Sequence, residues 1–151
     1  MAQLKFSIIN GPNLNLLGTR EPDIYGTFSL ADIETLCRDK AKHLDVSIDF
    51  MQSNYEGALV EAIQQAGTNS DGILINAAAY THTSIAIHDA LGAAKLPTIE
   101  VHLSNIFRRE EFRHTSFVSA YANGVICGFG PTGYEFGLVQ LKSLAEAAKN
   151  H

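Results

Sequence analysis

The sequence predicts a doubly wound α/β domain, in which helices cover both faces of a parallel sheet. Short apolar runs alternate along the chain with longer stretches whose apolar residues recur at helical spacing. Strands that alternate with helices of this length form parallel sheets, because each helix returns the chain to the same edge. With 151 residues, of which 46% are hydrophobic, the chain is long enough for one stable core. We therefore expect residues 1–151 to form one domain with a five-stranded sheet.

Five segments are predicted to be strands. Three of them are largely apolar, as expected for strands buried on both faces, and the fourth strand has one apolar and one polar face. The second alternates between apolar and polar side chains, which is typical of a strand near the edge of a sheet. The segments are residues 4–9, 46–51, 72–76, 97–103 and 124–127.

Four segments between and after these strands are predicted to be helices. Ser29 begins the first one, which runs to about residue 44, and Asp32 completes a variant of the capping box. The second spans residues 54–67, with Gly67 as a plausible stop just past its last turn. The third spans roughly residues 83–94, and leucines and alanines at helical spacing over residues 138–148 mark the last.

Composition excludes several classes of function. The formal net charge of −5 disfavours a protein that binds nucleic acid through its phosphate backbone. Cys37 and Cys127 have no metal-ligand spacing, so we expect reduced cysteines that act as small hydrophobic residues. The chain starts with a strand pattern rather than a signal peptide, and no apolar run is long enough to cross a membrane. A cytoplasmic enzyme or binding protein is the expectation.

The loop after the first strand has two interpretations. Residues 10–13, Asn-Gly-Pro-Asn, end the strand, and residues 14–26 then combine leucines with two glycines, Arg20 and Tyr25. Long loops in compact domains are often functional, which favours an active-site lid at about residues 19–26. A surface loop packed by its own leucines is the alternative, and position alone weighs the two equally.

Open parallel sheets bind ligands beyond the carboxyl ends of their strands, where this chain places three polar clusters. The first is residues 10–13. The second is residues 76–82, in which Asn76 and His82, taken singly, are more often a turn residue and a structural histidine. His82 would share a helix face with Asp89 if the third helix begins early, whereas His88 would lie on the surface.

The third cluster is Glu100-Val-His102-Leu-Ser104. Side chains two apart on a strand point the same way, so these three polar residues share a face. In isolation an edge strand with a solvated face is the favoured interpretation. The alternative is a general acid with its partner, because a glutamate beside a histidine fixes the tautomer and raises the basicity of the imidazole.

Other catalytic motifs are missing from the sequence. The histidines show no metal-ligand spacing, no serine lies in a nucleophile elbow, and the glycines at 128 and 130 lack the phosphate-binding fingerprint.

Taken together, the three clusters resemble the type II 3-dehydroquinate dehydratases over essentially the whole chain. The matching residues are 10–20, 25–26, 76, 79–84 and 100–105, extended by 111–113, 124–128 and 133–134. Three positions depart from the family pattern. Ala77-Ala78 stands where the family often has Pro-Gly, His88 where it often has arginine, and Phe107-Arg108 where His-Ala is common.

The resemblance implies a flavodoxin-like fold and the dehydration of 3-dehydroquinate without a cofactor or metal. By carry-over, Tyr25 is the base, Arg20 stabilises its phenolate, and Asn13 holds a water at the enolate oxygen. His102 is the acid that protonates the leaving hydroxyl, and Glu100 orients it.

The resemblance also implies substrate contacts and an assembly. Leu103 and Ser104 would bind the substrate carboxylate, and the ring hydroxyls would contact Asn76, His82 and Arg113. Asp89 would reach a neighbouring subunit's site within trimers that form a dodecamer. The resemblance fits two pathways equally, the synthesis of aromatic amino acids and the breakdown of quinate.

Two other functions are alternatives. A flavin- or nucleotide-binding module would need a phosphate-cradling first loop, and residues 11–13 lack its hydroxyls and glycine spacing. An inactive scaffold would be expected to lose at least one of Arg20, Tyr25 and His102, and all three are present.

Overall fold

The computed structural model describes residues 2–19 and 21–150, except the side chains of Pro22 and Tyr25. Within these residues a parallel sheet has five strands in the order β2-β1-β3-β4-β5. This confirms the predicted α/β class, and β2 lies at the edge, as its alternating pattern predicted. The strands are β1 (Lys5–Asn10), β2 (Ser47–Gln52), β3 (Gly72–Asn76), β4 (Thr98–His102) and β5 (Gly124–Cys127).

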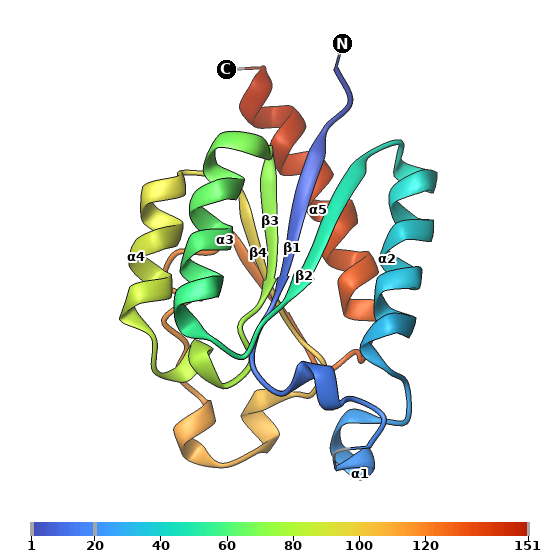
Figure 1. Cartoon of the computed structure of the whole chain (residues 1–151), viewed down its shortest axis with the longest axis vertical. Coiled ribbons are helices and arrows are strands. Elements are labelled where there is room, and N and C mark those ends of the chain that lie inside the picture. The colour runs from blue at the N-terminus through green and yellow to red at the C-terminus, as the bar shows by residue number, and fades with distance from the viewer. Residues whose placement is uncertain (1, 20, 151) are drawn as a thin grey trace.

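Helices cover both faces of the sheet (Figure 1). On one face α2 (Leu30–Leu44) packs beside α5 (Thr132–Lys149), and on the other α3 (Glu56–Asn69) packs beside α4 (Ile85–Ala94). Strand β1 supplies both cores, because alternate side chains point to opposite faces. Phe6 and Ile8 lie in the core under α2 and α5, and Ile9 lies in the core under α3 and α4.

Two helix boundaries differ from the prediction. Gly67 is not the stop of α3, which continues to Asn69. A Cβ on Gly67 would lie 3.3 Å from the Cα of Ala94, so this glycine allows α3 and α4 to pack closely. Helix α4 begins at Ile85, where the hydroxyl of Ser84 caps it, rather than near residue 83. The capping box at the start of α2 is confirmed, with Ser29 and Asp32 bonded reciprocally.

The first loop is partly packed on the core. Leu14 and Leu17 are buried, whereas Leu16 is exposed, so the leucines anchor residues 14–17 to the domain. A short helix, α1 (Pro22–Tyr25), follows near the carboxyl end of the sheet (Figure 1). Arg20 lies outside the described residues.

A close backbone contact joins the loops that follow β1 and β3. The Gly11 N–H donates to the Asn76 carbonyl at 2.7 Å. A Cβ on Gly11 would lie 2.3 Å from the Ala77 carbonyl oxygen, so only glycine fits here. Strand order changes direction between β1 and β3, which is where doubly wound sheets bind ligands.

Candidate active site

A pocket opens at the carboxyl ends of β1, β3 and β4. It encloses about 550 Å³, counting the space open to solvent. The three polar clusters of the sequence meet there, together with two arginines from residues 109–113. Its lining is Pro12, Asn13, Leu14, Asn76, Ala78, Ala79, His82, His102, Leu103, Ser104, Ile106, Arg109 and Arg113.

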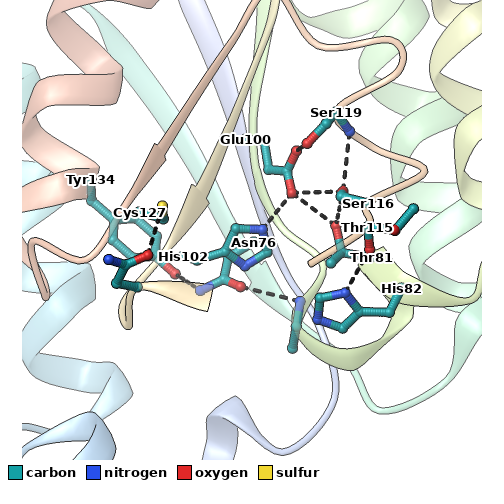
Figure 2. A network of polar contacts seen from close by, with 12 residues as sticks. Asn76, Thr81, His82, Glu100, His102, Thr115, Ser116, Ser119, Cys127 and Tyr134 are labelled. Carbon is teal, nitrogen blue, oxygen red and sulfur yellow. Dashed lines mark hydrogen bonds and ion pairs between the residues drawn. The ribbon is translucent and has the colours of Figure 1, made fainter. Parts of the chain in front are cut away.

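His102 and Glu100 form a buried imidazole–carboxylate pair on β4 (Figure 2). Nε2 of His102 is hydrogen-bonded to Oε2 of Glu100, and because an ionised carboxylate only accepts, Nε2 holds the proton. Glu100 has no exposed surface, and β4 lies inside the sheet between β3 and β5. The edge-strand interpretation is therefore wrong. Thr81 and the irregular segment that contains Ser116 and Ser119 cover the polar face that the sequence assigned to solvent.

Three hydroxyl groups surround the Glu100 carboxylate. Ser116 and Thr81 donate to Oε2 at 2.8 and 3.0 Å, and Ser119 donates to Oε1. Burial alone would raise the pKa of Glu100, but the bond and positive charge of His102 and the serine hydroxyls outweigh it. The pKa of this carboxyl therefore lies below its ordinary value. Glu100 is ionised at neutral pH and can stabilise a protonated imidazole.

His82 lies beside His102, with nearly parallel rings whose centroids are 6.5 Å apart. Its Nδ1 bonds to the Thr115 carbonyl at 2.8 Å, so Nδ1 holds the proton and Nε2 is an acceptor. Burial, with positive charge from His102 and Arg113, places the pKa of His82 below its ordinary value. A neutral His82 can accept a hydrogen bond from a hydroxyl in the pocket.

Two asparagines also line the pocket. Asn13 adopts left-handed backbone geometry, with φ of 69°, and its N–H donates to Asn54 Oδ1 at 2.9 Å. Asn76 is buried at the end of β3. Its side chain is bonded on both sides, to the Tyr134 hydroxyl and to the Ala78 N–H (Figure 2).

Arginines make one side of the pocket positive. Nε of Arg113 donates to Glu110 at 2.7 Å, which helps to orient its guanidinium. Arg109 reaches the Ser104 hydroxyl at 3.5 Å, a long hydrogen bond. Guanidinium groups bind carboxylates and hydroxyls well, so this side favours an anionic, oxygen-rich ligand.

Most predicted site residues come together, and a few do not. Asp89 is exposed on α4 and does not line the pocket, and His82 precedes that helix, so the two share no helix face. His88 is only half-exposed, because its Nδ1 bonds to the Phe117 carbonyl at 3.0 Å. The side chain of Tyr25 is outside the described part of the chain, as is Arg20.

Two groups of site residues were not predicted from the sequence. Arg109 lies among the basic residues of segment 108–113, and nothing in the sequence distinguishes it from Arg108. The hydroxyls that hold Glu100 were not predicted either, because Thr81 had no assigned role within the second cluster and Ser116 and Ser119 lie in an irregular segment. Only the folded chain brings them to the same carboxylate.

Other kinds of site are not supported by the described residues. They contain no group of three or more histidine, cysteine, aspartate or glutamate side chains placed to hold a metal ion. None of their helices has the length and apolar character needed to span a membrane. Burial raises the pKa of the Cys37 thiol to about 12, which makes it unreactive. Fold and site define an α/β protein with a buried imidazole–carboxylate pair beside a pocket at the carboxyl edge of its sheet.

Comparison with known proteins identifies the family. Residues 4–142 match the model of the family described as dehydroquinase class II. A 3-dehydroquinate dehydratase of Dinoroseobacter shibae is 58% identical over 89% of this chain and 90% of its own. A 3-dehydroquinate dehydratase of Brucella canis is 57% identical over 95% of this chain and 92% of its own. The type II dehydroquinase structure from Butyrivibrio crossotus covers 93% of this chain and 98% of its own, with a TM-score of 0.91 and 44% identity. The chain belongs to the dehydroquinase class II family and is a lyase.

Proposed function

We propose that this pocket dehydrates 3-dehydroquinate to 3-dehydroshikimate through an enolate. Membership of the dehydroquinase class II family supports the substrate. The observation that supports the mechanism best is the ionised Glu100 behind His102, at the wall of a pocket lined by donors, acceptors and arginines. This pair is suited to giving a proton to a leaving hydroxyl.

The elimination has two proton transfers. A base removes a proton from the carbon between the ketone and the carbon that bears the hydroxyl, and the C–H electrons form an enolate. The enolate collapses to an enone as the C–O bond breaks, and the hydroxyl leaves with a proton from Nδ1 of His102 as water. Nε2 of His102 remains bonded to Glu100 throughout, so the carboxylate stabilises the imidazolium before the transfer.

Tyr25 is the proposed base. A free tyrosine has a pKa of about 10, so its phenolate needs a nearby cation, and Arg20 is assigned this role. The backbone of Tyr25 lies in α1, near the carboxyl end of the sheet that holds the pocket (Figure 1). Residues 19–26 would close as a lid and exclude water. Tyr134 is unsuitable as a base, because its side chain has no exposed surface and burial raises its pKa.

The remaining residues are assigned to substrate binding. The amides of Leu103 and Ser104 and the Ser104 hydroxyl would hold the carboxylate, with positive charge from Arg109 beside them. Asn13 would hold a water against the enolate oxygen. The ring hydroxyls would bond to Asn76, His82 and Arg113. Among these, His82 would be a neutral hydrogen-bond acceptor.

Assembly is proposed from the family resemblance. Asp89 is exposed on α4, which leaves its carboxylate accessible to a neighbouring subunit. We expect trimers that form a dodecamer, in the cytoplasm, with Asp89 at the edge of a neighbour's pocket.

A continuous ultraviolet assay with 3-dehydroquinate tests the proposal. We expect enone absorbance to rise, and to do so equally with a chelator or with borohydride, because the route needs neither a metal nor a Schiff base. Tyr25→Phe should abolish turnover. Tyr121→Phe is the matched control, because its hydroxyl bonds to the Leu96 carbonyl away from the pocket. No turnover by folded wild-type protein would favour a non-catalytic role, and a normal rate in Tyr25→Phe would exclude Tyr25 as the base.

A further inference from the structure

A buried chain of hydrogen bonds runs from β2 to the wall of the pocket. Nδ2 of Asn10 donates to the Met51 carbonyl at 3.0 Å. The Tyr134 hydroxyl donates to Oδ1 of Asn10 at 2.6 Å and accepts from Nδ2 of Asn76 at 3.0 Å. The side chains of Asn10 and Tyr134 have no exposed surface, and Asn76 has 3%. Figure 2 shows the hydroxyl of Tyr134 directed at the Asn76 amide.

Counting protons fixes the direction of every bond in this chain. The Met51 carbonyl only accepts, so Nδ2 of Asn10 must face it and Oδ1 must face Tyr134. A phenol has one proton, which is therefore committed to Asn10. Toward Asn76 the phenol can only accept, which requires the Nδ2 end of that amide.

A hydrogen bond on the other side of Asn76 independently requires the same orientation of its amide. The Ala78 N–H donates to Oδ1 of Asn76 at 3.1 Å, and an N–H cannot bond to the Nδ2 end. A flipped amide would lose both bonds at once, inside a site where unpaired polar groups are costly. Burial also raises the pKa of Tyr134, so the phenol keeps its proton across the physiological range.

We propose that Tyr134 is a positioning residue for the reaction, which sets the polarity of the Asn76 amide. Nδ2 of Asn76 has two hydrogens and Oδ1 has two lone pairs, and the chain uses one of each. One N–H and one lone pair remain for a substrate hydroxyl, which both donates and accepts. The inference rests on the proposed role of Asn76 in binding the substrate. It adds that a buried residue of α5, together with the Ala78 N–H, holds the orientation in which Asn76 is presented to the substrate.

Kinetics of Tyr134→Phe separate positioning from mere packing. The variant keeps the ring and removes the hydroxyl, so Asn76 loses the bond that holds Nδ2. Because Asn76 contacts the bound substrate before and during the reaction, we expect KM to rise about fivefold to tenfold while kcat changes less than twofold. Tyr121→Phe, which removes a hydroxyl away from the pocket, should leave both constants unchanged.

A double-mutant cycle shows whether Tyr134 acts through Asn76. In an Asn76→Ala background, Tyr134→Phe should cause no further rise in KM, because the group it positions is gone. A full additional rise, or an unchanged KM in the single variant, would overturn the proposal. If Tyr134→Phe does not fold, Asn10→Leu replaces it, because it retains the phenol but removes the acceptor of its proton. The same rise in KM is expected, and an unchanged KM would overturn the proposal.

A crystal structure of Tyr134→Phe separates this inference from the proposed function. If wild-type protein does not turn over 3-dehydroquinate, the proposed function fails, but the position of the Asn76 side chain still tests the positioning. A rotated amide in Tyr134→Phe, with the wild-type orientation in Tyr121→Phe, supports it. An Asn76 side chain that keeps both its orientation and its bond to Ala78 in Tyr134→Phe would refute it.

Discussion

Replacing Glu100 with glutamine removes a charge while keeping the shape of the site. The best orientation of the glutamine places its carbonyl oxygen where Oε2 of Glu100 accepts from His102, Thr81 and Ser116. Its amide nitrogen then faces Ser119, whose hydroxyl can turn and accept. The hydrogen bonds are therefore satisfied, and any effect on the rate reports the loss of the carboxylate charge.

The size of the effect follows from the change in the bond to His102. A hydrogen bond to a charged group contributes about 1.5–3 kcal/mol, against about 0.5–1.5 kcal/mol for a neutral pair. Pairing like ends of these ranges gives a loss of about 1–1.5 kcal/mol, which falls on the protonated form of His102, the proposed acid. We expect kcat at neutral pH to fall by about 5-fold to 13-fold.

The assay is kcat for 3-dehydroquinate at neutral pH, with Glu61→Gln as the matched control. Glu61 is exposed on α3 and should tolerate the same substitution without effect. An unchanged kcat in Glu100→Gln, or an equal loss in Glu61→Gln, would refute the argument. Either result would mean that the charge of Glu100 does not support the protonated imidazole.

Three further predictions concern stability. Ala78 has a left-handed backbone, with a φ of 52°, so Ala78→Gly should relieve about 1–2 kcal/mol of strain. The larger loss of backbone entropy by glycine on folding offsets part of this gain, so the urea midpoint should rise slightly. Gly11→Ala should cost about 1–3 kcal/mol of unfolding free energy, because its Cβ meets a backbone oxygen at 2.3 Å, whereas Gly57→Ala, in open space, should stabilise. At pH values below about 6.5 the free energy of unfolding should decrease, because His82 gains a proton more readily in the unfolded chain than in the folded one. At pH values below about 4.5 it should decrease again, because the unfolded chain protonates Glu100 before the folded chain does. Urea titrations should show the first loss reduced in His82→Asn and the second in Glu100→Gln; an unchanged pH dependence would contradict each assignment.

The local sequence pattern was sufficient to predict the main strands and helices and most residues of the pocket. Apolar runs located the strands, because burial on both faces leaves a signal in the strand itself. The rule that ligands bind at the carboxyl edge then placed Asn13, Asn76 and His102 at one site. Both inferences depend only on residues near one another in sequence and on a general property of parallel sheets.

Strand order and tertiary contacts were not available from local pattern. The polar face of β4 was predicted to be solvated, as in an edge strand, because nothing in residues 97–103 shows that β5 pairs beside it. Gly67 looked like a helix stop, because its contact with Ala94 joins helices far apart in sequence. The hydroxyl groups around Glu100 and the phenol behind Asn76 were missed for the same reason.

The most direct test of the account is to separate the two proton transfers in His102→Ala. In deuterated solvent, nuclear magnetic resonance measures exchange of the proton next to the ketone, and ultraviolet absorbance measures the enone. If His102 is the leaving-group acid, enone formation should fall by about 10²–10⁴-fold while exchange falls much less. An equal loss of exchange and elimination would contradict the account and assign His102 to the first step instead.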